Sequence, residues 1–224
     1  MADLPNPADH SEVRLALRRA GRLRVRRPHQ VVGLTAKLLE HIVLACPDTL
    51  AGYRDAALLS VGYDTLCRSH ELVAMQVAHL GAAFATVHVP RSKSDPFGDG
   101  RTAYLSKPTR HRLDRWLEHS KLEDGALFRG LARGCVSPGP FRTSSARRLI
   151  KRAAMQAGID PDLANALSGH SMRMGAAQDM MLAGIDTVAI MQAGGWKSHE
   201  VLGRYVEHAA AERMHEKRSA RLET

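Results

Sequence analysis

The sequence predicts a mainly α-helical protein with one small antiparallel β-hairpin. Most of its 224 residues fall into segments whose apolar residues recur every three to four positions, which is typical of amphipathic helices. A single region, rich in β-branched and aromatic residues, carries the proline- and glycine-rich loop of a hairpin. The hydrophobic content of 44% and the charged content of 25% are those of a globular chain that can bury a substantial core.

The first 33 residues differ in character from the rest. The stretch RLALRRAGRLRVRR, at residues 14–27, holds seven arginines and no acidic residue, and Pro28 ends it. Such a run is either a solvated tail or a set of contacts to nucleic-acid phosphates, and the sequence favours neither interpretation. We expect residues 1–33 to form a basic arm or an interdomain linker, followed by one folded domain at residues 34–224.

Helical periodicity begins at Leu34 and recurs to the end of the chain. The first amphipathic helix is indicated by the spacing of Leu34, Leu38, Leu39, Ile42 and Val43. Further helices are expected at residues 49–66, 68–78, 107–120, 144–157, 169–183, 187–194 and 199–218. The expected N-caps of the last four are Ser144, Ser168, Asp186 and Ser198.

Two short segments break the helical pattern. FATVHV at residues 84–89 and TAYLS at residues 102–106 consist of residue types that favour strands. The segment RSKSDPFGDG lies between them, and its Pro96, Gly98 and Gly100 predict a hairpin loop. The expected fold class is therefore mainly α with one small antiparallel sheet.

The amino-acid composition indicates which kinds of partner the protein could bind and in which cellular compartment it would act. A net charge of +9 and a pI near 9.9 favour a polyanionic partner, either nucleic acid or an acidic membrane. The three widely spaced cysteines, Cys46, Cys67 and Cys135, indicate neither a disulfide framework nor a cysteine zinc site. No stretch is apolar enough to span a membrane, and MADLPNPADH does not resemble a signal peptide. We expect a cytoplasmic protein. The twelve histidines form no metal-binding motif, so we expect no metal site.

Five polar residues are candidates for chemistry: Arg68, Lys93, His170, Arg173 and Tyr205. Four of them have ordinary structural explanations, such as a core tyrosine, a loop lysine or an arginine paired with Glu71 on its own helix. Arg173 is harder to explain, because methionines and alanines surround it. Arginine is seldom buried without a partner, so an anion is expected at this position.

Three segments resemble the catalytic domain of tyrosine recombinases, the phage integrase family. They are SGHSMRMGAAQDMMLAGI at residues 168–185, IMQAGGW at residues 190–196 and RY at residues 204–205. The family pattern is an arginine with an acidic residue three positions later, a lysine in a hairpin loop, H-x-x-R, a later His or Trp, and a tyrosine. In this sequence the pattern matches Arg68 and Glu71, Lys93, His170 and Arg173, Trp196 and Tyr205. The resemblance covers about residues 34–218.

The resemblance implies site-specific DNA cleavage and rejoining through a 3′-phosphotyrosine intermediate, with no metal and no cofactor. Arg68 and Arg173 would clamp the non-bridging oxygens of the phosphate, because guanidiniums offer fixed pairs of donors. Tyr205 would be the nucleophile, and a tyrosine needs help in losing its proton because its usual pKa is about 10.

The remaining matched residues would support this chemistry. His170 would assist proton transfer, and Lys93 would protonate the leaving 5′-oxygen as general acid. Trp196 would donate its indole N–H to a phosphate oxygen while its ring packs the pocket. Glu71 would support Arg68 or His170 from behind.

Two other functions remain open at this level. The chain could be a DNA-binding regulatory or truncated relative without recombination activity, or a type IB topoisomerase-like enzyme that relaxes DNA. In every case the expected partner is double-stranded DNA at the nucleoid, with no membrane and no small-molecule substrate. The expected phosphate contacts outside the active site are Arg24, Arg26, Arg27 and Arg91.

Assembly can be anticipated only from the resemblance. We expect a monomer or weak oligomer in the free protein and a tetramer on DNA. Residues 206–218 would form a C-terminal helix exchanged between protomers, and docking in the same chain is about as probable. The apolar face of this helix consists of Val206, Ala209, Ala210 and Met214. The N-terminal domain with which such enzymes close around DNA is expected to be absent from this chain.

Overall fold

The computed structural model describes residues 6, 8, 10–23, 32–90 and 100–220. Contacts divide the chain into two units, Met1–Gln30 and Val31–Thr224, each of which is considered by itself. In the first unit the described structure is mainly the helix α1 (Ser11–Leu23), which carries four of the seven arginines of the run at residues 14–27. Alanine, leucine and arginine are strong helix formers, which explains a helix that the sequence analysis did not predict.

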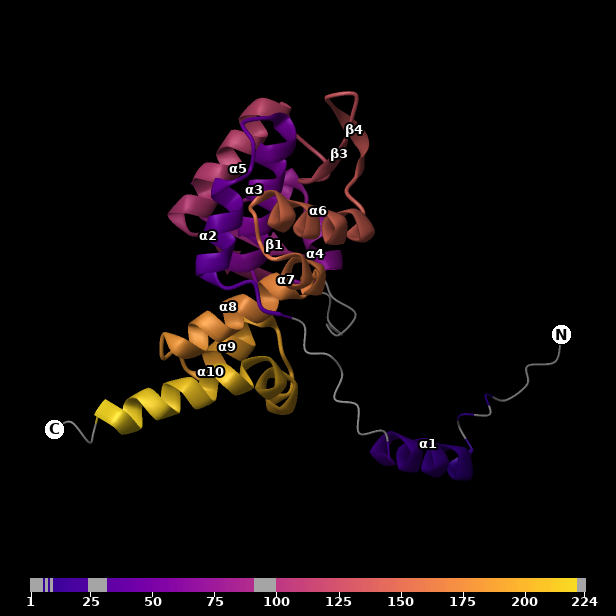
Figure 1. Ribbon diagram of the computed structural model, residues 1–224. Coiled ribbons are helices and arrows are strands. Elements are labelled where there is room, and N and C mark those ends of the chain that lie inside the picture. Colours follow the sequence, from indigo (N-terminus) through magenta and orange to yellow (C-terminus); the bar gives the residue numbers. More distant parts are fainter. Residues whose placement is uncertain (1–5, 7, 9, 24–31, 91–99, 221–224) are drawn as a thin grey trace. The chain divides into compact units, whose positions relative to one another are not determined.

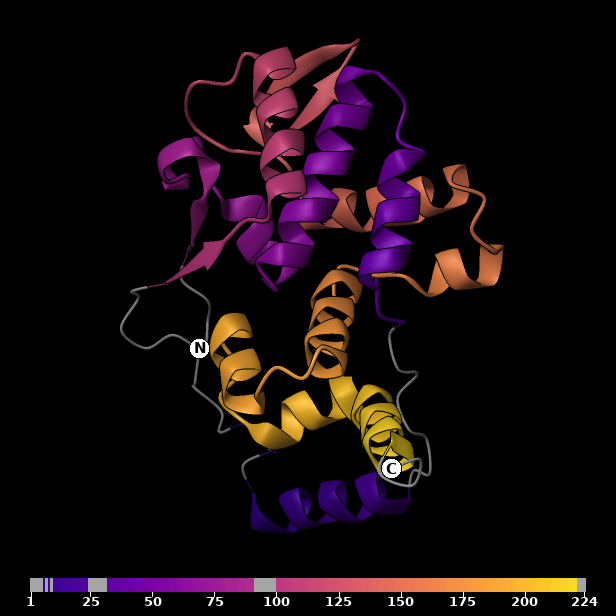
Figure 2. The same ribbon diagram turned by 90° about the vertical axis from the view of Figure 1, so that its left-hand side faces the viewer.

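The second unit is mostly helical, which confirms the predicted class. Its described helices are α2 (Ala36–Leu44), α3 (Leu50–Asp64), α4 (Ser69–Ala74), α5 (Lys107–Ser120), α6 (Thr143–Gln156), α7 (Pro161–Ala166), α8 (Ser171–Leu182), α9 (Thr187–Gly194) and α10 (His199–Ala220). Two short 3₁₀ turns lie at Val77–His79 and Ala82–Phe84. Figure 1 and Figure 2 show α8, α9 and α10 together at one end of this unit, with α2 to α6 at the other.

The predicted antiparallel hairpin is confirmed, and a second hairpin that was not predicted accompanies it. The expected hairpin is present as β1 (Thr86–Val89) paired antiparallel with β2 (Arg101–Tyr104). A second hairpin joins β3 (Arg129–Ala132) to β4 (Cys135–Pro140). Its two turn residues, Arg133 and Gly134, have φ values of 52° and 78°, as a tight type I′ turn requires. The second pair escaped prediction because its strands contain glycines and prolines and lack alternating apolar residues.

Several helix boundaries also differ from prediction. The helix expected at 68–78 ends at Ala74, because Met75 turns to an extended conformation and its carbonyl accepts a hydrogen bond from the amide of Leu127. The short helix α7 was not predicted. Asp160 caps it, and Pro161 occupies its first position.

The predicted N-caps are partly confirmed. Asp186 caps α9 by accepting a hydrogen bond from the amide of Val188 at 2.8 Å. Ser144 and Ser168 are not N-caps, since Arg142 and His170 occupy those positions. Ser168 caps a turn instead, where its hydroxyl accepts from the amide of His170. The helix α10 begins directly after Ser198.

Buried side chains form two clusters. The larger contains Trp116, Phe128 and apolar residues of α2 to α6, with contributions from both hairpins. The smaller contains apolar residues of α8, α9 and α10, together with Leu66 after α3 and Trp196 between α9 and α10. The helix α8 reaches both clusters, because Met172 lies in the larger and Ala177 in the smaller. This helix therefore connects the two ends of the unit.

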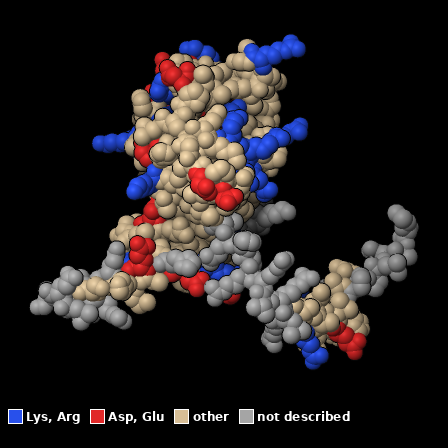
Figure 3. All heavy atoms as spheres, viewed as in Figure 1, with Lys and Arg blue, Asp and Glu red and all other residues tan. Residues whose placement is uncertain are grey.

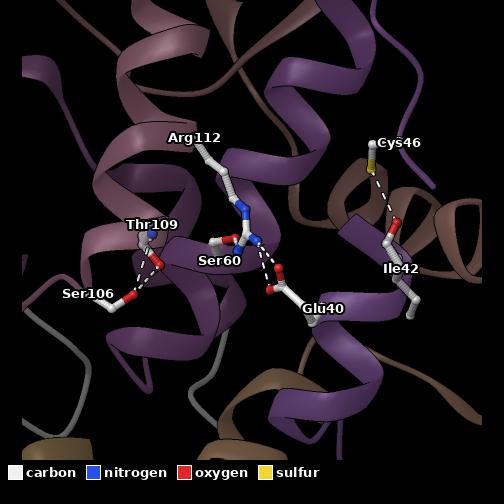
Figure 4. A network of polar contacts seen from close by, with 7 residues as sticks. All are labelled: Glu40, Ile42, Cys46, Ser60, Ser106, Thr109 and Arg112. Atoms are coloured by element: carbon white, nitrogen blue, oxygen red, sulfur yellow. Dashed lines mark hydrogen bonds and ion pairs between the residues drawn. The ribbon is translucent and has the colours of Figure 1, made fainter. Parts of the chain in front are cut away.

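Polar contacts fasten the helices of the larger cluster. Arg112 on α5 donates to both carboxylate oxygens of Glu40 on α2, at 2.6 and 2.7 Å, and to the hydroxyl of Ser60 on α3 at 3.1 Å (Figure 4). The same figure shows Ser106 beside Thr109, where the Ser106 hydroxyl caps the start of α5. These contacts fix α5, which follows directly after β2.

The segment that leads into α2 is fastened to α8. The amide of Leu34 donates to the carbonyl of Ser171 at 2.7 Å, and the amide of Ala36 donates to the Asp179 carboxylate at 2.6 Å. Gly175 permits this approach, because a Cβ at that position would lie 1.9 Å from the Leu34 carbonyl oxygen. The position of α8 is thereby set from both of its ends.

The helix α10 packs on α8 within the same chain. Val206 and Ala209, two of the four residues expected to face a neighbouring subunit, are 4% and 5% exposed. Met214 remains exposed. In this arrangement the chain itself covers most of the face, so exchange of the helix between subunits stays a prediction.

None of the helices among the described residues is long and apolar enough to cross a membrane. Within the same ranges, no three His, Cys, Asp or Glu side chains gather in a way that could hold a metal ion.

Candidate active site

Arg68 and Glu71 lie at the start of α4 and form an ion pair. One carboxylate oxygen of Glu71 accepts from the Arg68 guanidinium at 2.9 Å, and the other accepts from the Arg68 main-chain amide at 2.7 Å. Glu71 is buried, whereas the Arg68 side chain remains 29% exposed. The carboxylate thus lies behind the guanidinium and fixes it toward solvent.

Arg173 on α8 is 2% exposed. Its Nη1 donates to the main-chain carbonyls of Leu66 and Gly194, at 2.5 and 2.6 Å. Its Nη2 is buried and has no hydrogen-bond partner, a condition shared among the described side chains only by Nε of Arg110. Burial, and next the charge of Arg68, lower the pKa of Arg173 to about 10, so the group remains charged near neutral pH. A buried cation with an unused donor is suited to an anionic ligand.

The side chains of Trp196 and Tyr205 lie next to Arg173, Trp196 in direct contact with it and Tyr205 beyond Trp196. The guanidinium carbon of Arg173 lies 3.6 Å from the centre of the Trp196 ring. The ring of Tyr205, partly buried on α10, meets Trp196 edge-on with centroids 5.8 Å apart. Gly194 is required here, because a Cβ would lie 1.9 Å from the indole. This close packing explains the glycine of the GGW segment.

His170 immediately precedes α8, one turn before Arg173. Its side chain is accessible to solvent but its ring is partly covered, and it shares a pocket of about 510 Å³ with Arg68. Gly169 brings the starts of α4 and α8 together, since a Cβ there would lie 1.8 Å from the Ser69 hydroxyl. The opposite wall of the pocket is the first turn of α6, with Thr143, Ser144, Arg147 and Arg148.

The pocket is strongly basic. Three arginines and two histidines line it, and none of its described lining residues carries a carboxylate. Over the face of the molecule drawn in Figure 3, basic and acidic side chains are interspersed. The net charge of +9 is therefore not spread evenly over the surface. Positive charge is concentrated at this pocket.

The pKa of His170 is expected to lie below its ordinary value of 6.5. Partial burial of the ring lowers it first, and the charges of Arg173, Arg68 and Arg147 lower it further. Protonation would add positive charge to a positive site, so the neutral imidazole persists to lower pH. The neutral form should therefore predominate near neutral pH and give way to the imidazolium only as the pH drops through the lowered pKa.

An NMR titration of the His170 ring would test this prediction. Arg68→Ala should move the midpoint upward, because it removes a nearby positive charge. Arg115→Ala, which removes a surface arginine paired with Asp48, should leave the midpoint unchanged. A wild-type midpoint at or above 6.5 would contradict the prediction.

The structure brings six of the sequence-derived candidates into one region. Arg68 is hydrogen-bonded to Glu71 and shares a pocket with His170. Arg173 lies over the Trp196 ring, and the ring of Tyr205 meets Trp196 edge-on. The two sets meet at the turn before α4, because Nη1 of Arg173 donates to the carbonyl of Leu66, two residues before Arg68. The other candidates, Lys93, Arg91, Arg24, Arg26 and Arg27, lie outside the described residues.

Three basic residues of this region were missed from the sequence. Arg147 and Arg148 line the pocket from α6, and Arg101 at the start of β2 lies close to Arg68 and Glu71. The paired arginines of TSSARR, at the start of an expected helix, were an available signal. Arg101 offered no such signal, because its position depends on contacts with residues distant in sequence.

Comparisons with known proteins agree with this geometry. The chain matches the Phage integrase family over residues 33–212. The recombinase Cre of Escherichia phage P1 is 28% identical, over 93% of this chain and 66% of Cre. The tyrosine recombinase XerC of Bifidobacterium longum (strain DJO10A) is 30% identical, over 74% of this chain and 46% of XerC. The chain thus spans less than two thirds of the length of these curated relatives.

Solved structures share the fold. The XerA recombinase superposes with a TM-score of 0.67 at 21% identity, over 92% of this chain and 73% of XerA. A lambda integrase dimer bound to a core site superposes with a TM-score of 0.59 at 18% identity, over 84% of this chain and 51% of that integrase. Identities this low carry the fold alone. The sequence match over residues 33–212 goes further, and it establishes that the chain belongs to the phage integrase family.

Proposed function

We propose that this protein is a site-specific DNA recombinase that cleaves and rejoins strands through Tyr205. The observation that carries the proposal is the arrangement of Arg173, whose unused buried donor lies one stacked ring away from Tyr205. A polyanionic substrate also suits the basic pocket at Arg68 and His170.

In the proposed first step the Tyr205 oxygen attacks a DNA phosphorus. A bond from the tyrosine oxygen to phosphorus forms, and the bond from phosphorus to the 5′-oxygen breaks. The guanidiniums of Arg68 and Arg173 neutralise charge that gathers on the non-bridging oxygens. Contact between the phosphate and the closed-off Nη2 of Arg173 requires neighbouring groups to shift as DNA binds.

Two proton transfers balance this step. His170 accepts the proton that leaves Tyr205, which suits a neutral imidazole, and Lys93 donates a proton to the departing 5′-oxygen. The tyrosyl phosphodiester preserves the energy of the broken linkage. A second DNA hydroxyl can then attack it, which reverses both proton transfers and rejoins the strands without an external energy source.

Double-stranded DNA is the proposed partner. Relatives of similar fold have been solved on DNA, among them XerH on its difH substrate and lambda integrase on a core site. Arg24, Arg26, Arg27 and Arg91 are proposed as further phosphate contacts in addition to the active-site residues. Assembly into a tetramer on DNA, through exchange of residues 206–218, belongs to the same proposal.

A library of DNA duplexes would test the function. Each duplex carries one nick at a fixed position between random flanks, so that cleavage near the nick releases a short fragment and traps the intermediate. The full chain should yield protein–DNA adducts that survive denaturation, and the recovered sequences should share one motif. Sequence-selective binding without any adduct would contradict the proposal and favour a DNA-binding relative without strand-transfer activity.

A further inference from the structure

Arg101 reaches the same turn of the chain that holds Arg173. Its Nη2 donates to the carbonyl of Thr65 at 2.7 Å. The next carbonyl, that of Leu66, accepts from Nη1 of Arg173. These two residues directly follow the last turn of α3, and Arg68 comes two positions after Leu66. Two guanidiniums therefore sit on adjacent carbonyls beside a third arginine.

The other side of Arg101 faces the GGW turn. A Cβ built on Gly195 would lie 3.6 Å from Nε of Arg101, which is ordinary contact distance. The preceding residue, Gly194, offers its carbonyl to Arg173. Arg101 and Arg173 thus span the same two segments side by side, Arg173 from Leu66 to Gly194 and Arg101 from Thr65 to Gly195.

The charges in this cluster are unbalanced. Arg101 is partly buried, and burial lowers its pKa, with Arg68 lowering it further and Glu71 opposing the change. The neighbouring thiol of Cys67 supplies no negative charge near neutral pH, because burial raises its pKa to about 11. Glu71 is the carboxylate that the described residues place among the three arginines, and it already pairs with Arg68. A ligand that brings negative charge would restore the balance.

We propose that Arg101 is a third arginine of the active site, whose charge helps neutralise the DNA phosphate held by Arg68 and Arg173. The proposal rests on the function proposed above. Arg101 starts the strand β2 and is anchored at Thr65, so its guanidinium is held in place before DNA arrives. Such preorganised charge costs no rearrangement when the phosphate binds.

A double-mutant cycle between Arg101 and the phosphate charge would test this inference. The protein carries Tyr205→Phe so that it binds without cleaving, and the DNA is the motif recovered from the nicked library. One DNA has an ordinary phosphate at the cleavage position, and the other has a methylphosphonate, in which a methyl group replaces one charged oxygen. Arg101→Ala should weaken binding of the phosphate DNA by about tenfold, as loss of a charged contact does, and barely change binding of the methylphosphonate DNA.

Control variants distinguish an effect of the Arg101 charge from an effect on the fold. Arg115→Ala removes an equal charge at the surface and should weaken binding of both DNAs equally or not at all. Arg101→Lys keeps the charge and should retain most of the discrimination between the two DNAs, whereas Arg101→Gln should lose it. This Lys and Gln pair decides the question even if Arg101→Ala does not fold, which thermal unfolding would reveal.

Two outcomes would overturn the assignment of Arg101. Equal weakening on both DNAs in a folded Arg101→Ala protein would make the residue a structural brace of the Thr65 turn. Unchanged binding to both would leave it with no role at the phosphate. Failure of the wild-type protein to form any adduct would instead count against the proposed function, so the two failures can be told apart.

Discussion

Replacing Tyr205 by phenylalanine is expected to abolish covalent attachment to DNA while leaving DNA affinity within about twofold of wild type. The substitution removes only the hydroxyl that would attack phosphorus. The phenyl ring can keep the edge-on contact with Trp196 that orders this part of α10. Adduct formation would be followed on denaturing gels, and affinity by fluorescence anisotropy.

Tyr104→Phe is the matched control for this experiment. Tyr104 is 78% exposed on β2, so loss of its hydroxyl should change neither adduct formation nor stability. An adduct that persists in Tyr205→Phe at the wild-type level would assign the nucleophile to another residue. Loss of both binding and adduct, with an intact fold, would show that the hydroxyl serves recognition of DNA.

Replacing Arg173 by alanine is expected to slow strand cleavage by about a hundredfold or more. One preorganised donor to a developing oxyanion contributes roughly 3 kcal/mol. The same change should lower the free energy of unfolding by about 3 kcal/mol, because it leaves a cavity and strands the buried carbonyls of Leu66 and Gly194 without their donor. Single-turnover rates and chemical denaturation would measure the two effects.

Arg173→Lys separates these effects. A lysine can donate to the two carbonyls and keep the charge, so much of the stability should return. It cannot hold those carbonyls and also present a second planar donor to phosphate, so cleavage should stay at least about tenfold slower. Arg110→Ala is a suitable control, since Arg110 also has a buried unpaired nitrogen but lies on α5, outside the lining of the basic pocket. Full activity in Arg173→Lys would reduce the role of Arg173 to its charge.

Local sequence patterns predicted the helical class, and the resemblance to the family supplied most of the residues proposed for the chemistry. Helix α5 begins and ends where its pattern predicted, at residues 107–120, and Asp186 caps α9 as expected. Capping and helix propensity act within a few residues, so such features can be read directly from a sequence. The apolar surroundings of Arg173 in the sequence likewise predicted an anion at this turn of the helix.

Only the tertiary structure decided how these residues meet. Arg173 is tied to Leu66, 107 positions earlier in the chain, and Arg101 to Thr65 across 36 positions. The early end of α4 at Ala74 likewise depends on a distant partner, the amide of Leu127. Contacts of this kind arise from packing of whole elements, because which carbonyl lies near which guanidinium depends on the positions of several helices at once. The sequence therefore determined the fold class and six of the residues at the site, whereas tertiary packing decided that Arg173 is buried on carbonyls and that Arg101 stands beside it.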